Sequence, residues 1–359
     1  MGFFCTRIIG TGAYLPTEVM SNNFFESYAF YNSDHSRNNK PSNEIVNKLT
    51  EISGITERRY ATANLHTSDI AFFAGKDAIE SSGIDPETLD YIIVAHNFGD
   101  VKDKTHFTDM LPNVAAKVKQ SLGILNSDCV AYDILFGCPS WIQAVIQADY
   151  YIRSGDAKRI LVIGADVMSR VLDPHDVDSM LFGDGAGAVI LESYESEERT
   201  GIICHKTVTD SVEKAEYLRM GCSNEYDEAD NRLYVKMNGR GVYKYAMETV
   251  PSAIDSCLKK LNIPIQKIDK ILMHQANEKM IRQLLRKLYE INGVDEVPES
   301  VFPLTVNQWG NSSAATVPML LDWIMKGRLE GHSIKPGDHI ILSSVGGGMH
   351  ANCIVYKHI

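Results

Sequence analysis

Short apolar runs alternate with longer amphipathic segments along almost the whole chain, and this pattern constrains the fold more than any other feature. In the first half the apolar runs lie near residues 8–9, 89–95, 130–134 and 159–164, and helix-length segments lie near residues 68–82, 110–122 and 140–153. Such alternation is typical of an α/β protein, in which helices cover a central sheet. The half closes on the small-residue run 185–191, where neighbouring backbones can approach closely.

A second series of the same kind follows the charged stretch 192–199, which is the best candidate for a boundary. It contains predicted helices over 241–261, 278–289 and 314–326 and predicted strands over 270–273 and 338–344. The two series share the order strand, helix, strand and a final glycine-containing segment, although their sequences differ too much to define a repeat. We therefore predict two α/β halves, residues 1–195 and 196–359.

The composition is that of a folded protein without membrane spans. The chain has 359 residues, 44% of them hydrophobic and 23% charged, and no apolar run approaches the roughly 18 residues of a membrane-spanning helix. The N-terminal residues lack the pattern of a secretory signal, so a cytoplasmic location is expected. The formal charge of −11 argues against general nucleic-acid binding, and the seven scattered cysteines show neither a disulfide framework nor metal-ligand spacing.

Three glycine-rich segments favour structural roles over nucleotide binding. Segment 10–12 (Gly-Thr-Gly) follows a predicted strand, but it lacks the third glycine and the helix start of a dinucleotide site. Segment 182–187 lacks the lysine of a phosphate-binding loop, which favours a tight turn. Segment 346–348 (Gly-Gly-Gly) follows a predicted strand and suits either a turn or an oxyanion hole, and the glycines alone do not decide between them.

Cys138 stands between a predicted buried strand and a predicted helix, with Pro139 at a position favoured for a helix start. Unpaired N–H groups and the positive end of the helix dipole would stabilise a thiolate at this place and lower the pKa of the thiol. The alternative is a small buried hydrophobic side chain, which is the commoner role of a free cysteine. Cys138 is still the best candidate nucleophile in the chain.

Two further junctions between strands and helices carry polar side chains. His274 follows the predicted strand 270–273, and Asn311 precedes the predicted helix 314–326. A single histidine in such a place is usually structural. A cysteine, a histidine and an asparagine at three such junctions, with a glycine loop at a fourth, instead indicate one shared catalytic site.

These motifs together resemble the β-ketoacyl-acyl-carrier-protein synthase III family across almost the whole chain. The matching segments are residues 8–16, 54–59, the Cys138 junction, 182–187, 274–277, 310–311 with 313–315, and 346–348. The resemblance implies a thiolase fold, with two similar α/β halves in five layers (helix, sheet, helix, sheet, helix), which normally forms a homodimer. It also implies a condensing enzyme of fatty acid or related polyketide-type biosynthesis that uses no metal or redox cofactor.

The resemblance also implies a role for each candidate residue. Cys138 takes the acyl group from a donor thioester, and the backbone N–H groups of Cys138 and Gly347 form the oxyanion hole. Malonyl carrier protein then loses carbon dioxide, and His274, as a neutral donor, and Asn311 stabilise the resulting enolate. The enolate carbon attacks the acyl group on Cys138, and a β-ketoacyl thioester is released.

The helix predicted after His274 supplies a basic face in an otherwise acidic protein. Its cationic residues recur near helical spacing: Lys279, Arg282, Arg286 and Lys287. In the family this face, with a lysine that matches Lys244, receives the acidic acyl carrier protein. The alternative is an ordinary solvated charged face.

Several positions depart from the family members that use acetyl-CoA. Lys48 and Val177 stand where a tryptophan and an arginine stack on the adenine, and Ile52 replaces an arginine that contacts the coenzyme. Losing these groups weakens nucleotide binding. Leu111 is smaller than the usual phenylalanine, a side chain that in the family reaches the acyl pocket of the partner copy. Trp141, also expected at the acyl pocket, differs from the family pattern near the nucleophile. We therefore predict a longer or differently shaped acyl donor, delivered by a carrier protein.

A simple thioesterase could act through the same acyl-enzyme, although the surroundings of Pro139 and Trp141 do not suggest a positioned water. Two further alternative functions stay open at the level of sequence. One is acyl transfer from Cys138 to a non-malonyl acceptor in secondary metabolism, for which Asn311 would not be needed. The other is a non-catalytic partner subunit, but such subunits tend to lose the nucleophile that this chain keeps. The complete set of Cys138, His274 and Asn311 favours condensation.

Overall fold

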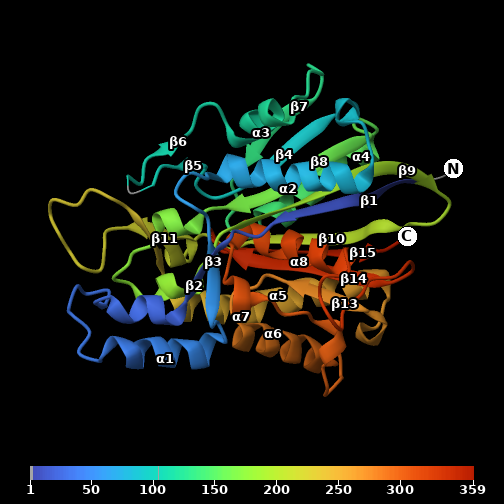
Figure 1. The fold of residues 1–359 in the computed structure, drawn as a ribbon. Helices are drawn as coiled ribbons and strands as arrows, with labels where there is room; N and C mark the ends of the chain where they lie inside the picture. The colour runs from blue at the N-terminus through green and yellow to red at the C-terminus, as the bar shows by residue number, and fades with distance from the viewer. Residues whose placement is uncertain (1–2, 104) are drawn as a thin grey trace.

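The computed structural model describes residues 3–103 and 105–359 and contains two large sheets with helices on their faces (Figure 1). The strands of the first sheet are β1 (Phe3–Tyr14), β4 (Tyr91–Ala95), β7 (Val130–Ile134), β8 (Arg159–Asp166) and β9 (Gly185–Ser196). Their order is β1-β9-β8-β4-β7, in which β4 pairs in parallel with β7 and β8, and β9 pairs antiparallel with β8 and β1.

The second sheet repeats much of this arrangement. Its strands are β10 (Gly201–Thr209), β13 (Lys270–Met273), β14 (His339–Gly346) and β15 (His350–Lys357). They follow the order β10-β15-β14-β13, with β13 parallel to β14 and β15 antiparallel to both of its neighbours. Three smaller pairs join β2 (Glu18–Ser21) with β3 (Glu57–Tyr60), β5 (Asp100–Val101) with β6 (Thr108–Asp109), and β11 (Leu218–Gly221) with β12 (Tyr234–Met237).

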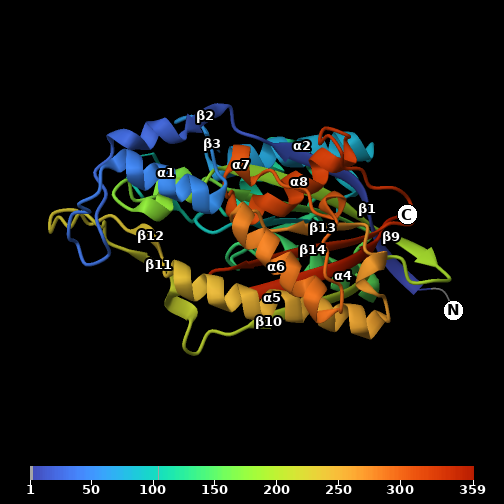
Figure 2. The ribbon, with the colours of Figure 1, turned by 90° about the horizontal axis from the view of Figure 1, so that it is seen from below.

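Helices form the other three layers of the molecule. They are α1 (Ser42–Ser53), α2 (Thr67–Ser82), α3 (Val114–Leu122), α4 (Ser140–Ser154), α5 (Gly239–Leu261), α6 (Glu278–Ile291), α7 (Val306–Trp309) and α8 (Thr316–Met325). α2 and α3 cover the outer face of the first sheet, α4 and α8 lie between the sheets, and α5 and α6 cover the second sheet (Figure 1). Seen from below, α5 and α6 lie side by side, and α1 contacts α6 (Figure 2). The five predicted α/β layers are confirmed.

A separate cluster of buried apolar side chains fills each boundary between layers. Trp141 of α4 and Leu320 of α8 belong to the cluster between the sheets, Ile70 of α2 to the cluster outside the first sheet, and Leu285 of α6 to the cluster outside the second. Because helices cover both of its faces, β8 is buried from its second residue to its last. The nearly continuous apolar sequence of this strand follows from that double burial.

Gly10 and Gly12 of β1 allow α2 to pack directly on the strand. A Cβ atom at Gly12 would lie 2.2 Å from the carbonyl oxygen of Ala74, and one at Gly10 would lie 2.5 Å from that of Ala78. The strand continues to Tyr14, so no helix starts after these glycines as a dinucleotide site would require. Close packing against α2 therefore explains the glycine pair.

The charged stretch 192–199 lies where the chain passes from the first sheet to the second, since β10 begins at Gly201. β9 continues to Ser196, and Glu192 forms ion pairs with Arg7 of β1 (2.7 Å) and Arg159 of β8 (2.9 Å). The charges therefore belong to the end of a paired strand, where the neighbouring strands supply the opposite charges.

The start of one helix and the presence of one strand differ from the sequence predictions. The helix expected from residue 110 begins only at Val114, because Pro112 and the N-cap residue Asn113 come just before it. β15 has no counterpart among the predicted strands, although it is buried along most of its length. In the described ranges, no helix is both long enough and apolar enough to cross a membrane.

Candidate active site

Cys138 lies between the end of β7 and the start of α4, at the junction that the sequence predicted. α4 begins at Ser140, so Pro139 is the N-cap residue of this helix and not a residue of its first turn. The end of β14 approaches the cysteine closely: a Cβ atom at Gly346 would lie 2.9 Å from the Cys138 Sγ. The absence of a side chain at Gly346 therefore makes room for the nucleophile.

Burial dominates the ionisation of Cys138. Desolvation raises the pKa of this thiol to about 11, while hydrogen bonds from the Ser313 side chain and from the backbone N–H groups of Cys138 and Gly347 act to lower it. The predicted lowering of the Cys138 pKa is therefore wrong, because desolvation outweighs the donors at the helix start. The two N–H groups predicted to form the oxyanion hole do lie at the sulfur.

His274 follows β13 and is 6% exposed. Its backbone N–H donates to the carbonyl of Ser343 on β14 (2.8 Å), and its Nδ1 lies 2.8 Å from the Thr316 Oγ1. Nε2 is then the ring nitrogen that is left for a ligand. Burial lowers the pKa of His274 to about 4, so the imidazole is neutral at neutral pH, as the sequence analysis expected.

Asn311 follows α7, and hydrogen bonds hold both its backbone and its side chain in place. Its backbone N–H donates to the Leu181 carbonyl (2.9 Å), and its own carbonyl accepts from Gly183 (3.0 Å). The Asn311 Oδ1 accepts a hydrogen bond from the backbone N–H of Ser313 (2.9 Å). Because this donor occupies Oδ1, the amide N–H groups are the part of the side chain that can serve a ligand oxygen.

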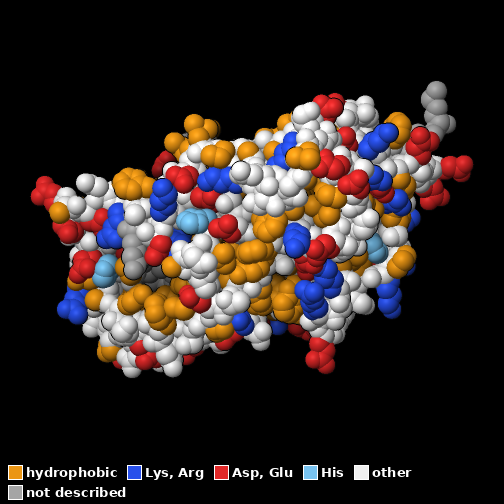
Figure 3. Space-filling view, turned by 45° about the horizontal axis from the view of Figure 1, so that its top comes forward, with side chains coloured by type: hydrophobic (Ala, Val, Ile, Leu, Met, Phe, Trp, Pro, Cys, Tyr) orange, Lys and Arg blue, Asp and Glu red, His pale blue; other side chains and the backbone are white. Residues whose placement is uncertain are grey.

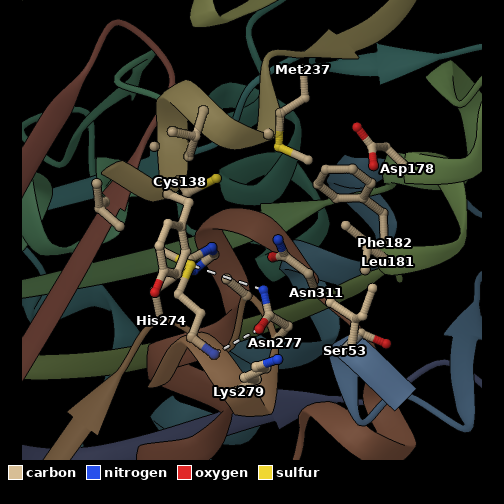
Figure 4. Close-up of a pocket in the computed structure, with 18 of the residues that line it drawn as sticks. Ser53, Cys138, Asp178, Leu181, Phe182, Met237, His274, Asn277, Lys279 and Asn311 are labelled. Atoms are coloured by element: carbon tan, nitrogen blue, oxygen red, sulfur yellow. Dashed lines mark hydrogen bonds between the residues drawn. The ribbon is translucent and has the colours of Figure 1, made fainter. Parts of the chain in front are cut away.

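One cavity brings the three candidate catalytic residues together. It has a volume of about 470 Å³, and Cys138, His274 and Asn311 extend into it from three different junctions between elements (Figure 4). Most of its other lining side chains are apolar, but Asp178 and Lys279 also line it. Burial raises the pKa of Asp178 to about 7. The cavity thus offers a nucleophile and two groups suited to an oxygen atom, inside a largely apolar wall.

A second cavity, of about 350 Å³, also opens to Cys138. It shares Cys138, Phe182 and Leu218 with the first cavity. The hairpin β11–β12 contributes to both, with Leu218 and Met237 in the first cavity and Met220 and Val235 in the second. Further apolar residues of the second cavity are Phe98, Leu135, Phe136 and Met168. The two cavities therefore meet at the candidate nucleophile.

Ser313 connects all three candidate catalytic residues, although the sequence analysis assigned it no role. Its hydroxyl donates to the Cys138 Sγ (3.3 Å), and its backbone N–H donates to the Asn311 Oδ1 (2.9 Å). Its carbonyl accepts from the Thr316 hydroxyl (3.1 Å), which contacts His274. In the sequence, the only feature that pointed to a role for Ser313 was its place two residues after Asn311, in a segment that matches the family.

The two residues predicted for the acyl pocket lie away from both cavities. Trp141 is 1% exposed, donates its indole N–H to the Val162 carbonyl (3.4 Å) and packs between the sheets. The prediction for Trp141 is wrong, because its side chain fills the core behind the nucleophile. Leu111 is 89% exposed and lines neither cavity of its own chain. Its predicted role concerns the pocket of a second copy and stays a prediction.

The predicted basic face is present on α6 and the adjacent part of α5. Lys279, Arg286 and Lys287 of α6 are exposed, and so is Lys244 of α5. Arg282 differs, because its guanidinium pairs with Glu278 (2.8 Å) and Glu299 (2.7 Å), which balance its charge. Lys279 also lines the first cavity, so the basic face reaches the cavity that holds Cys138.

Two family models match the chain. The model described as 3-oxoacyl-[acyl-carrier-protein (ACP)] synthase III matches residues 132–211, and the one described as 3-oxoacyl-[acyl-carrier-protein (ACP)] synthase III C terminal matches residues 258–358. The β-ketoacyl-[acyl-carrier-protein] synthase III of Staphylococcus haemolyticus is 35% identical over 351 residues, which cover 98% of each chain.

Solved structures agree over the same length. The 3-oxoacyl-[acyl-carrier-protein] synthase III of Aquifex aeolicus superposes with a TM-score of 0.76 at 30% identity, covering 98% of this chain and 99% of its own. The β-ketoacyl-[acyl carrier protein] synthase III of Thermus thermophilus gives 0.77 at 31% identity, with 98% of each chain covered. The predicted thiolase fold is thereby confirmed.

Proposed function

Because the chain belongs to the 3-oxoacyl-[acyl-carrier-protein] synthase III family, we propose that Cys138, His274 and Asn311 carry out its two-step reaction. The chain is a β-ketoacyl-acyl-carrier-protein synthase III-like condensing enzyme, a transferase of fatty acid biosynthesis, and its family implies acyl and malonyl carrier proteins as substrates. The observation that carries the assignment of residues is the single cavity into which all three side chains extend.

In the first step, the Cys138 thiolate attacks the carbonyl carbon of the donor thioester. The backbone N–H groups of Cys138 and Gly347, which hydrogen-bond the sulfur, are placed to hold the negative oxygen of the tetrahedral intermediate. The intermediate collapses with loss of the donor thiolate, which leaves with the proton that Cys138 gave up. The acyl group is then carried as a thioester on Cys138.

In the second step, malonyl carrier protein enters the first cavity and loses carbon dioxide. The electron pair of the broken carbon–carbon bond forms an enolate, whose oxygen accepts hydrogen bonds from the Asn311 amide and the His274 Nε2–H. Nε2 carries that proton when the Thr316 hydroxyl turns its single proton from the Ser313 carbonyl (3.1 Å) to the His274 Nδ1 (2.8 Å). The enolate carbon attacks the acyl carbonyl and releases the Cys138 thiolate. The Cys138 thiolate then takes up a proton from water, which restores the thiol for the next cycle.

Intact-protein mass spectrometry tests this order of events. A donor thioester should add the mass of one acyl group to the protein. Malonyl carrier protein should then remove this adduct and yield a β-ketoacyl product. An adduct that malonyl carrier protein does not discharge would instead favour acyl transfer to another acceptor.

We further propose that the donor carries an acyl chain longer than acetyl and arrives on a carrier protein. The second cavity extends from Cys138 along apolar side chains, which supports a role in holding that chain. Ile52, which lines the first cavity, replaces an arginine that contacts the coenzyme in family members that use acetyl-CoA, and this loss weakens the binding of a nucleotide there. Each methylene buried in an apolar pocket contributes about 0.8 kcal/mol, which corresponds to roughly fourfold in binding.

Acylation rates with a series of donors test this proposal. We expect kcat/KM for formation of the acyl-enzyme to rise by about tenfold or more from acetyl to medium-chain donors, since several methylenes enter the second cavity. The same chains should react faster on a carrier protein than on coenzyme A. Acetyl-CoA as the fastest donor would contradict both parts of the proposal.

We propose that the acyl carrier protein docks on the exposed basic face formed by Lys244, Lys279, Arg286 and Lys287. The support for this is the position of Lys279, which joins that face to the cavity of Cys138. An acidic partner would be steered to these charges in a protein whose net charge is otherwise negative.

Charge reversal on the basic face tests the docking. In the double variant Lys244→Glu and Arg286→Glu, we expect KM for malonyl carrier protein to rise by about fivefold or more at unchanged kcat, because exposed pairs contribute roughly 0.2–1 kcal/mol each. The condensation with malonyl-pantetheine, which lacks the acidic protein, should be unaffected. Lys76→Glu on α2, on the opposite outer layer, is the matched control. An unchanged KM would place the docking surface elsewhere.

We propose that the chain forms a homodimer, because members of its family usually do. β7 is an edge strand of the first sheet, and none of its residues is fully buried. Near its two ends, Leu125 and Leu135 are 88% and 67% exposed, and Leu111 precedes the neighbouring helix α3. Figure 3 turns this part of the molecule forward and shows hydrophobic side chains among the charged ones. A second copy would cover this edge, and sedimentation equilibrium measures whether it does.

A further inference from the structure

A chain of hydrogen bonds runs behind Cys138 from a buried carboxylate. Asp166, at the end of β8, is 1% exposed and accepts three N–H groups. These come from the Asn97 backbone (2.8 Å), the Asn97 side chain (2.7 Å) and the Ala314 backbone (3.1 Å). A carboxyl group that receives three donors acts as an acceptor, so the atom of Asn97 that faces it is the amide nitrogen.

The second N–H of the same amide fixes the direction of the next hydrogen bond. The Asn97 Nδ2 lies 2.8 Å from the Ser313 Oγ, so Asn97 donates to Ser313 while it also donates to Asp166. The proton of the Ser313 hydroxyl must then point away from Asn97. Its acceptor is the Cys138 Sγ at 3.3 Å, within the range of hydrogen bonds to sulfur.

The backbone of Ser313 is held in an uncommon conformation that keeps the hydroxyl in this place. Its φ angle is +52°, in the left-handed region that few residues other than glycine adopt. The residue is 1% exposed, and both its N–H and its carbonyl take part in hydrogen bonds, with Asn311 and Thr316. Segments at the ends of β4 and β8 thus converge with the loop before α8 to aim one hydroxyl at one sulfur.

We propose that Ser313 is a positioning residue whose hydroxyl, aimed by Asn97 and Asp166, gives the Cys138 thiolate one fixed hydrogen bond. The Ser313 hydroxyl holds the sulfur in place for attack on the first thioester. It hydrogen-bonds the thiolate again when the second step releases it; these two roles rest on the proposed function. A hydrogen bond to the charged form favours ionisation, which opposes the desolvation of the buried sulfur.

Other titratable groups lie near the sulfur and also affect how the reactivity of Cys138 depends on pH. Those that line the two cavities with Cys138 are Asp178, Arg219, Tyr243, Lys279, His274 and His350, and Asp166 lies behind Asn97. Among these, Asp166 raises the pKa of Cys138 by its charge, in opposition to Ser313. Removing the Ser313 hydroxyl leaves all of these groups in place, so a change in the profile can be assigned to that hydroxyl.

Alkylation of Cys138 by iodoacetamide, followed by mass spectrometry of the peptide that contains it, tests the proposal. Ser313→Ala and Ser313→Gly should raise the apparent pKa of Cys138 by about one unit, which slows alkylation about three- to tenfold at a fixed pH below that pKa. Glycine adopts a positive φ without strain and alanine does not, so agreement between the two variants separates the hydroxyl from the backbone. Asn97→Ala, which keeps the hydroxyl but frees its direction, should give a smaller change in the same sense.

Ser312→Ala is the matched control, because Ser312 is also buried and its hydroxyl reaches only the sulfur of Met319 (3.7 Å). Wild-type alkylation profiles in both Ser313 variants, with unchanged melting temperatures, would overturn the proposal. This readout does not depend on condensation. A protein that alkylates as expected but does not condense malonyl carrier protein would remove the proposed function and leave the role of Ser313 intact.

Discussion

Replacing Cys138 with alanine should abolish the acyl-enzyme and lower the rate of condensation by about 10³-fold or more. In the proposed reaction, the sulfur carries the acyl group between the two steps, and a methyl group cannot form a thioester. Intact-protein mass spectrometry after incubation with a donor thioester should show no added mass in this variant. The cavity walls stay in place, since Cys138 is only partly buried and the change removes a single heavy atom.

Cys222→Ala is the matched control for this experiment, because Cys222 is the exposed cysteine of the described residues. It should acylate and condense as the wild-type protein does. An adduct that persists on the Cys138 variant would remove Cys138 from its role. An adduct lost in the Cys222 variant would move the nucleophile to the other cysteine.

Replacing Asn311 with alanine should separate the two steps. Formation of the acyl-enzyme should change little, because the donors for the first oxyanion are backbone N–H groups at Cys138. Release of carbon dioxide from malonyl carrier protein, and with it condensation, should fall by about 10²- to 10³-fold, the usual effect of removing one donor to a developing oxyanion. Rapid-quench measurement of both steps on the same preparation checks this.

Asn311→Ala also removes the acceptor of the Ser313 N–H, so a second variant is needed to separate this effect. Asn311→Asp keeps an oxygen for the Ser313 N–H, which now donates to Oδ1 at 2.9 Å, but it cannot donate to an enolate. It should therefore acylate normally and fail in decarboxylation, like the alanine variant. Gln308→Ala, on the exposed side of the same segment, is the unaffected control. Equal loss of both steps in the aspartate variant would mean that Asn311 has a structural role.

The positions of Cys138, His274 and Asn311 could be predicted from the sequence for a physical reason. Each lies where an apolar strand or a helix begins or ends, and such junctions gather at the same edges of packed sheets. The apolar pattern predicted the strands, and the predicted strand ends placed each polar residue at a junction. The charged stretch before β10 lies at the change from the first sheet to the second, but the ion pairs of Glu192 could not be predicted, because they form only when the strands are paired.

Other features depend on contacts that no local pattern encodes. The role of Ser313 follows from a positive φ angle and from Asn97 and Asp166, which lie more than a hundred residues away in the chain. The pKa of Cys138 depends on how deeply the sulfur is desolvated, which a helix start alone does not determine. Trp141, three residues after the nucleophile, points into the core between the sheets, a direction that depends on the packing of both sheets and not on the local pattern.

The meeting of two cavities at one sulfur has a kinetic consequence. Of the two cavities that meet at Cys138, the first holds His274 and Asn311. In the proposed reaction both carrier-bound thioesters use this first cavity in turn, while the acyl chain occupies the second. Initial-rate plots against one substrate at several fixed levels of the other should then be parallel lines. A large excess of malonyl carrier protein should slow turnover, because it occupies the entrance before Cys138 has been loaded. The cell's ratio of the two carrier species would thus set how fast new chains begin.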